Sequence, residues 1–357
     1  MSKLKFEKFE MKYGYFLPSE FKEFMNKVGS DNFFGSCNFE CSENIVNNII
    51  REYGKMDFRL LPFGVVGNGD YYCFYRYGEN KDDYYIGIWL SESRNFIVLC
   101  SSFESFLYRC CLDDYFSTVI ENDEVTLEDN MILNKESIKR CEYLCNEYGF
   151  DIEKVKTIED KVDYHRLMVD YDPYAIQSLC FLGNYYLDME KEKGIDILNI
   201  VKDKFKCYAA PYYILGKYYF DKGLAIAREE FLKGVRSSLI FTGYSYWEED
   251  YVGIPLEVHR NMSYYLDGRK ITSENYLEKS IVKGKDPYSL ILRLEVAEKY
   301  KENEEYEKAL NEYANAIYCT DDVLIIKDIL KEALNCCDEG GIFYLRKLIM
   351  QDIKYLK

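Results

Sequence analysis

A seven-residue segment occurs twice in this chain, and it limits what the C-terminal half can fold into. Residues 182–188 read LGNYYLD and residues 215–221 read LGKYYFD, so five of seven positions are identical at an offset of 33 residues. This period is typical of stacked helical hairpins, in which each hairpin buries its apolar face against the next. A looser third copy spans residues 294–300, and residues 306–318 after it place small side chains beside aromatic ones.

The repeat predicts that residues 173–357 form a short, irregular, all-α solenoid that resembles tetratricopeptide or Sel1-like helical repeats. Residues 243–268 interrupt the pattern with several Gly and Pro residues, and we expect a loop or a divergent repeat there. An unrelated helical bundle, in which the repeated heptapeptide arises by chance, is the alternative. Residues 119–172 are predicted to form an acidic linker followed by helices.

The first 118 residues follow a different pattern, in which helices precede a series of strands. Apolar residues recur at helical spacing over residues 17–28, and a second helix is predicted at residues 42–53. Aromatic or branched runs separated by turn-forming residues predict an antiparallel meander, with strands at residues 71–77, 84–90 and 96–100. Ser102 is placed to cap a last helix. Residues 1–118 are therefore predicted to be an α+β domain, an antiparallel sheet with packed helices.

Three blocks of this domain occur in a characteristic order. Leu17 and Pro18 open the first helix, residues 61–74 contain a glycine-rich turn between two apolar runs, and Ser102 opens the closing helix. Together the blocks resemble the SUKH superfamily, which includes a fungal cell-wall-synthesis regulator and bacterial toxin-immunity proteins. Tyr75 departs from the pattern, since many members carry an acid in that strand. The residues that carry the resemblance are Leu17, Pro18, Phe21, Gly64, Gly67, Gly69, Asp70, Ser102, Phe103, Phe106 and Leu107.

The resemblance implies direct protein binding without catalysis, because bacterial members of the superfamily mostly neutralise a cognate toxin by contact. The net charge is −16, of which −12 falls on residues 116–357. Such a charge favours a basic protein as partner and argues against nucleic acid or an anionic membrane, although acidity also serves solubility alone. We therefore expect an immunity-type protein that binds a basic toxin domain. A regulatory scaffold that binds cellular partners through the repeats is the alternative, and an enzyme that works with carboxylates alone is a third.

One predicted loop combines acids with aromatic residues and is the candidate contact surface. It contains Glu79, Asp82, Asp83, Tyr84 and Tyr85. Aromatic anchors dominate the energy of protein interfaces, and acids would complement a basic partner. The same residues also suit a solvated hairpin turn, which is the simpler interpretation.

Residues that commonly carry chemistry are few. His165 and His259 are the only histidines, neither lies near other ligands in the sequence, and both are expected to be structural. Cys141 and Cys145 would share a helix face, but zinc needs four ligands and closely spaced cysteine pairs of the usual type are missing. Inert, buried thiols are therefore expected. No catalytic residue, metal or cofactor is predicted.

The cysteine content also bears on location. The chain has 13 cysteines, an odd number, in a protein much larger than the small domains that disulfides stabilise. Basic residues near the start are not followed by the apolar run of a secretory signal. Free thiols and a cytoplasmic location are therefore expected.

Overall fold

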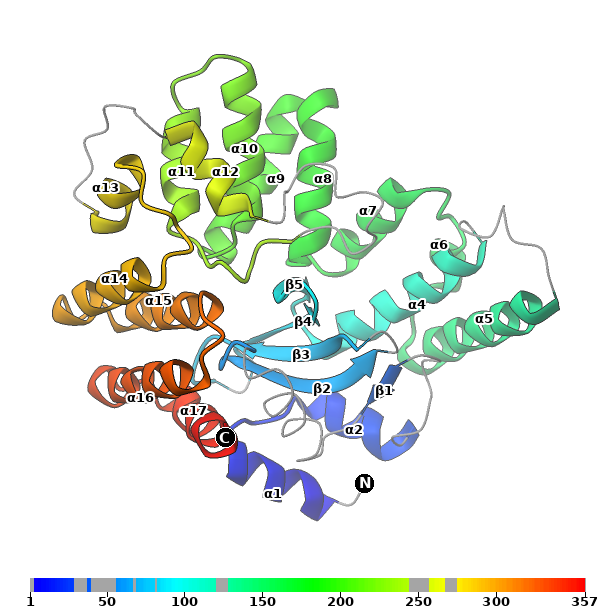
Figure 1. Ribbon diagram of the computed structural model, residues 1–357. Helices are drawn as coiled ribbons and strands as arrows, with labels where there is room; N and C mark the ends of the chain where they lie inside the picture. The colour runs from blue at the N-terminus through cyan, green and yellow to red at the C-terminus, as the bar shows by residue number, and fades with distance from the viewer. Residues whose placement is uncertain are drawn as a thin grey trace.

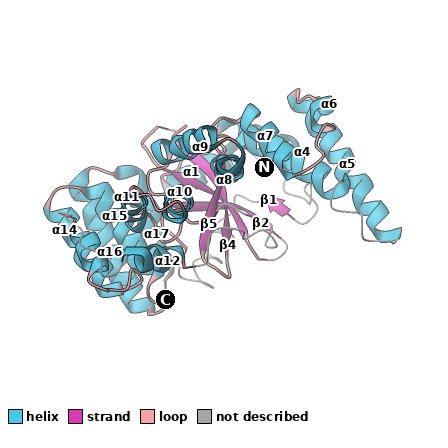
Figure 2. Cartoon of the chain, turned by 90° about the horizontal axis from the view of Figure 1, so that it is seen from above, coloured by secondary structure: helices cyan, strands magenta, loops and turns pink. Residues whose placement is uncertain are grey.

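A five-stranded antiparallel sheet lies at the centre of the molecule, and helices surround it (Figures 1 and 2). The computed structural model describes residues 3–28, 37–39, 56–66, 69–80, 82–119, 128–243, 257–266 and 275–356. The predicted fold class, an α+β domain followed by an all-helical region, is confirmed. The helix predicted at residues 42–53 lies outside the described residues. Among the described residues, no helix has both the length and the apolar character needed to cross a bilayer.

The sheet is the predicted meander, with each strand antiparallel to the next in chain order. A register shift interrupts the pairing of the second and third strands between Pro62 and Gly64, and another interrupts the fourth and fifth between Ile86 and Gly87. The strands are β1 (Cys37–Phe39), β2 (Leu60–Val66), β3 (Tyr71–Arg76), β4 (Tyr84–Leu90) and β5 (Asn95–Cys100).

Helices α2 (Ser19–Val28) and α4 (Phe103–Val119) cover one face of this sheet. The hydroxyl of Ser102 accepts a hydrogen bond from the backbone N–H of Ser105 at 3.0 Å, which confirms the predicted cap. Aromatic rings fill the interface, mostly in edge-to-face contacts, while Phe63 and Phe74 are stacked. Such pairs stabilise a core beyond the area they bury. The rings in contact are those of Phe21, Phe63, Phe74, Phe103 and Phe106.

The rest of the chain is helical throughout its described part. Residues 258–266, inside the predicted interruption, form a helix that packs against the preceding one. The helices are α5 (Glu128–Tyr148), α6 (Ile152–Val155), α7 (Lys161–Tyr171), α8 (Ile176–Met189), α9 (Lys191–Lys204), α10 (Ala210–Asp221), α11 (Ala227–Val235), α12 (Val258–Leu266), α13 (Tyr276–Val282), α14 (Leu290–Glu302), α15 (Tyr306–Tyr318), α16 (Val323–Gly340) and α17 (Phe343–Tyr355).

The repeated heptapeptide occupies the same place in two successive helical hairpins. Gly183 lies on α8 and faces α9, where a Cβ atom added to it would lie 2.6 Å from Cγ of Leu198. Gly216 lies on α10 and faces α11, where an added Cβ would lie 2.5 Å from the ring of Phe231. Glycine therefore permits the close approach of two helices at both positions. The two copies are structurally equivalent, as expected of helical repeats.

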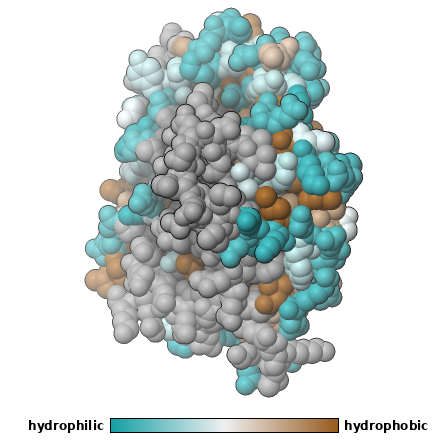
Figure 3. Space-filling view, turned by 90° about the vertical axis from the view of Figure 1, so that its right-hand side faces the viewer, coloured by the Kyte–Doolittle hydropathy of each residue, from teal (hydrophilic) through white to brown (hydrophobic). Residues whose placement is uncertain are grey.

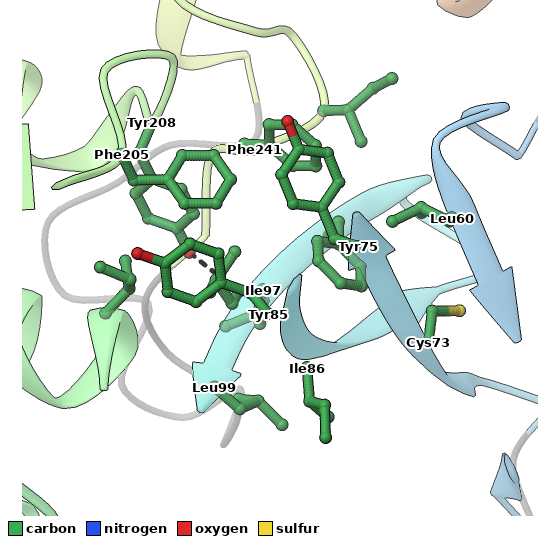
Figure 4. Packing of buried hydrophobic residues seen from close by; sticks show 14 of the residues in the cluster. Leu60, Cys73, Tyr75, Tyr85, Ile86, Ile97, Leu99, Phe205, Tyr208 and Phe241 are labelled. Carbon is green, nitrogen blue, oxygen red and sulfur yellow. Dashed lines mark hydrogen bonds between the residues drawn. The ribbon is translucent and has the colours of Figure 1, made fainter. Parts of the chain in front are cut away.

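The helical region packs against the second face of the sheet (Figure 4). Tyr75 of β3 and Tyr85 of β4 are opposite each other in the register. Both rings contact the ring of Phe205, with centroid distances of 5.3 Å, and Tyr75 also contacts Phe241 at 4.9 Å. Both faces of the sheet are therefore buried within the chain.

The same region covers the outer edge of β5. The backbone N–H of Phe96 donates to the carbonyl of Ile240 at 2.9 Å, and that of Val98 donates to the hydroxyl of Tyr208 at 3.4 Å. The N–H of Ser101, just beyond the strand, donates to the carboxylate of Asp172 at 2.7 Å. An uncovered edge strand can pair with other chains, and these contacts remove that possibility for β5.

The two ends of the described chain also meet. Helix α1 (Lys3–Tyr13) lies beside α17 at the bottom of Figure 1. Nζ of Lys12 donates to the hydroxyl of Tyr355 at 3.0 Å, and Nζ of Lys347 donates to the carbonyl of Met11 at 2.9 Å. One hydrophobic core contains residues from all three segments that the sequence distinguishes, while their boundaries at residues 118 and 172 stay a prediction.

Candidate protein-binding surface

The predicted contact loop forms the turn between β3 and β4, and its residues separate into two groups. Glu79 and Asp82 are exposed, and Asp83 is half-buried. Tyr84 and Tyr85 are buried, at 5% and 6% exposure. The acids of this loop therefore face solvent, whereas its two tyrosines lie inside the molecule.

The buried tyrosines hold the domain together. The hydroxyl of Tyr84 accepts a hydrogen bond from the backbone N–H of Phe103 at 3.0 Å, at the start of α4. The ring of Tyr85 packs against the helical region, as described above. Burial raises the pKa of both tyrosines. These two side chains cannot act as anchors for a partner while the chain is folded.

Three other aromatic side chains near this turn are exposed. Phe16 precedes α2, Tyr77 follows β3, and Phe343 opens α17, with exposures of 58%, 45% and 63%. Sequence reasoning did not identify them as contact residues. Phe16 and Phe343 lie near opposite ends of the chain. Phe16 lies against Arg76, and Tyr344, the residue after Phe343, is hydrogen-bonded to Glu79.

Arg76 connects these residues. Its guanidinium donates to the carbonyls of Gly78 at 2.8 Å and of Glu79 at 2.6 Å, and so fixes the start of the turn. Its Cζ atom lies 5.7 Å from the ring centroids of both Phe16 and Tyr344. The backbone N–H of Tyr344 donates to the carboxylate of Glu79 at 3.2 Å. One buried arginine thus joins the segment before α2, the turn and the start of α17.

We call Phe16, Tyr77, Glu79, Asp82 and Phe343 the aromatic–acidic surface. Exposed aromatic rings bordered by acids can anchor a basic protein, because the rings supply contact area and the acids supply complementary charge. Asp83 is not included, because its carboxylate stabilises the turn. It accepts hydrogen bonds from the backbone and side-chain nitrogens of Asn80 at 3.1 and 2.9 Å.

On the face that Figure 3 shows, hydrophobic residues lie in small groups between hydrophilic ones. Single exposed apolar residues are normal on protein surfaces and need no partner. The aromatic–acidic surface differs because exposed rings and exposed acids lie near one turn.

The glycine-rich turn between β2 and β3 is structural in its described part. Gly69 has φ of +89°, a conformation that side chains disfavour. The carboxylate of Asp70 accepts a hydrogen bond from the backbone N–H of Ser91 at 2.9 Å, so it links this turn to the one after β4. Asp70 is therefore a structural residue of this turn. Gly67 lies outside the described residues, and Gly64 lies at the register shift in β2.

The remaining motif residues contribute to packing and capping. Leu17, Phe21, Phe103, Phe106 and Leu107 are all 2% exposed or less. Pro18 directly precedes α2, and its carbonyl accepts a hydrogen bond from the N–H of Lys22 at 3.1 Å. The three sequence blocks therefore build the helix-covered side of the sheet.

The two histidines are buried. Nδ1 of His165 lies 2.9 Å from the hydroxyl of Ser178, and Nε2 of His259 lies 3.0 Å from that of Ser237. Burial lowers the pKa of both imidazoles, in His259 to about 3. Each histidine is therefore neutral at pH 7 and held by a hydroxyl group, as a structural residue is.

Two adjacent acids on α4 have a raised pKa, because burial disfavours their charged form. Asp113 forms an ion pair with Arg109 at 3.7 Å, and Asp114 forms one with Arg140 at 2.6 Å. Each acid is thus paired with its own arginine. The two do not share a proton in the way that a catalytic carboxylate pair does.

A third cysteine lies beside the two that were predicted to share a helix face. Cys141 and Cys145 lie on α5, and Cys111 on α4 brings its sulfur atom 2.9 Å from the first and 3.4 Å from the second. All three thiols are buried. The sequence spacing predicts that Cys141 and Cys145 share one helix face. It does not indicate that α4 packs there and brings Cys111 beside them.

Comparison with known proteins identifies the first part of the chain. Residues 1–109 match the profile of the SMI1 / KNR4 family (SUKH-1). The N-terminal domain is a SUKH domain. The match ends within α4, so it covers β1 to β5, α1, α2 and the beginning of α4. Neither the curated proteins nor the solved structures gave a match.

Proposed function

We propose that this protein is a non-enzymatic, immunity-type protein that neutralises a basic toxin domain by direct contact in the cytoplasm. The observation that carries the proposal is the SUKH-1 match over residues 1–109, since that family includes immunity proteins. The net charge of −16 supports a basic partner, because opposite charges steer two proteins together. The buried state of both histidines agrees with a binding role rather than a catalytic one.

The aromatic–acidic surface is the contact site that we propose. Phe343 begins α17, Tyr77 directly follows β3, and Phe16 lies three residues before α2, so all three are close to regular elements. Aromatic anchors that are already positioned lose little conformational entropy on binding. Arg76 is itself buried and positions the turn, so the surface is formed before a partner arrives. Glu79 and Asp82 would interact with Lys or Arg side chains of the toxin domain at the rim.

The fold also excludes one surface from this role. The sheet face that carries Tyr75 and Tyr85 is occupied by Phe205 and Phe241 of the helical region. A fragment that ends near residue 118 would expose this face to water and bind other proteins nonspecifically. The binding test therefore uses the full chain.

The test combines capture and rescue. Full-length protein captures binding proteins from native lysate, and a basic protein found in this way is expressed alone and together with the full chain. We expect the captured protein to arrest growth when it is alone and to lose that effect when the full chain is present. The variant Phe16→Ala/Phe343→Ala, which removes two exposed rings, should lose both capture and rescue.

A matched control removes a ring and an acid from elsewhere on the surface. Tyr264 is 80% exposed on α12, and Glu302 is exposed at the end of α14, so Tyr264→Ala/Glu302→Lys should still capture and rescue. Equal capture by the surface variant and by the wild type would show that the toxin binds elsewhere. Captured proteins without toxicity would contradict the immunity function itself.

A regulatory scaffold is the second candidate, and the charge of the last hairpins favours it. Residues 290–340, which span α14 to α16, contain six Lys or Arg and thirteen Asp or Glu residues. A basic cellular partner could bind there without using the SUKH domain. Capture of non-toxic basic proteins that survives Phe16→Ala/Phe343→Ala would support this second function.

A further inference from the structure

We propose that Cys111, Cys141 and Cys145 form a binding site for a divalent, thiophilic metal ion of the zinc class. The site lies between α4 and α5, away from the aromatic–acidic surface. It does not depend on the function proposed above, because its evidence comes from different residues.

The geometry of the three sulfur atoms carries the proposal. They all lie within 4.8 Å of one another, and Cys111 is 2.9 Å from Cys141 and 3.4 Å from Cys145. Zinc–sulfur bonds of about 2.3 Å in a tetrahedron place neighbouring sulfurs about 3.8 Å apart. The side chains therefore need to move apart by only about 1 Å to surround such an ion.

Burial is the second observation. The side chains of Cys111, Cys141 and Cys145 are at most 4% exposed, so an ion among them would be shielded from water. Metal-bound cysteines are thiolates, and buried anions are costly unless a cation compensates for them. A divalent ion at the centre of the three sulfurs would supply that charge.

The residue set indicates the class of ion. Thiolates select soft or borderline metals such as zinc. Three thiolates with a divalent ion leave one negative charge, whereas a monovalent ion would leave two in the same buried place. Within the described ranges, no fourth His, Cys, Asp or Glu side chain joins the group. The fourth position of the tetrahedron would therefore be taken by water or a small anion.

Binding is a proton exchange. The S–H bonds of the thiols break, their protons pass to solvent, and each sulfur donates an electron pair to the metal. No oxidant is required. The consequence is a link between α4, where the SUKH-1 match ends, and α5, so metal binding would stabilise the junction between the SUKH domain and the helices that follow.

The first experiment titrates the chelator-treated full chain with Cd²⁺ in the presence of a reductant that does not bind metal. We expect about one equivalent per chain, seen as the ultraviolet sulfur-to-cadmium charge-transfer band, and a rise in melting temperature. Cys111→Ser should abolish the band and the rise. Cys110→Ser changes the adjacent residue, which is not part of the group, and should bind as the wild type does.

The wild-type titration decides the question even if Cys111→Ser does not fold. Saturation at one equivalent, with Zn²⁺ competing for the same site, would support the proposal. A wild type without the charge-transfer band would overturn it. So would alkylation and mass spectrometry showing two of these cysteines in a disulfide, because the cluster would then be a redox pair.

Discussion

The ring of Tyr85 on β4 lies against the ring of Phe205 at the end of α9, with 5.3 Å between the ring centroids. Phe205 also contacts Tyr75 and Phe241, at 5.3 and 5.2 Å. It is 4% exposed, so its ring fills the junction between sheet and helical region. The stability of the two parts is therefore coupled through one aromatic cluster.

Phe205→Ala should lower the free energy of unfolding by about 3–5 kcal/mol, because it removes a buried ring and leaves a cavity. Urea unfolding followed by circular dichroism measures this loss. Phe343→Ala removes a ring that is 63% exposed and should cost less than about 0.5 kcal/mol. Similar midpoints for the two variants would mean that the junction contributes little to stability.

Much of the fold could be predicted from the sequence because local patterns determine it. The helical spacing after Leu17, the cap at Ser102 and the aromatic or branched runs between turns follow from short-range rules, and the structure confirms the predicted helix, cap and strands. The repeated heptapeptide also carries a glycine at the same position in both copies, Gly183 and Gly216. In the structure both glycines lie at a helix–helix contact.

The packing of the two parts against each other could not be predicted. Tyr75 and Tyr85 lie in strands in which nearly every residue is buried, but nothing near them in the sequence indicates that Phe205 covers them. For the same reason, the sequence did not indicate which aromatic rings near the contact loop are exposed. Its acids are exposed, whereas the exposed rings come from distant positions such as Phe16 and Phe343.

The first hairpin offers a test of the repeat glycines. Alanine at position 183 would place a Cβ atom 2.6 Å from Cγ of Leu198, so α8 and α9 would have to separate. We expect Gly183→Ala to cost about 1–3 kcal/mol from overpacking, despite a gain of about 1 kcal/mol in helix propensity. Thermal unfolding of the variant and of the wild type measures the net change in stability.

Steric conflict makes a further, specific prediction for this hairpin. Gly183→Ala/Leu198→Ala should lose less free energy of unfolding than the sum of the losses of the two single variants. The shortened side chain at position 198 leaves room for the new methyl group at position 183. Strictly additive effects of the two substitutions would contradict a close contact between these positions.

A buried ion pair joins the two helices of the third repeat. Nη1 of Arg293 on α14 lies 2.9 Å from Oε2 of Glu312 on α15, and both side chains are at most 2% exposed. Arg293→Met should cost about 3–5 kcal/mol, because it leaves a buried carboxylate without its cation. Arg293→Met/Glu312→Leu should recover most of this loss. A double-mutant cycle on urea midpoints gives the coupling, and a coupling near zero would show that solvent already screens the pair.

The final prediction concerns pH. Burial, with a contribution from the charge of Arg293, lowers the pKa of His259 from 6.5 to about 3. Between these values the unfolded chain binds a proton that the folded chain does not, so stability rises with pH across this window and falls as the pH is lowered. One such histidine contributes up to about 1.4 kcal/mol for each pH unit.

His259→Gln removes this titration while it keeps a polar side chain near Ser237. The variant should therefore lose less stability than the wild type between pH 6.5 and pH 4, measured as urea midpoints at each pH. His165 also has a lowered pKa, so the variant should keep part of the slope, and His165→Gln/His259→Gln should remove more of it. Parallel pH profiles for all three proteins would show that His259 is already protonated in the folded state or exposed to solvent.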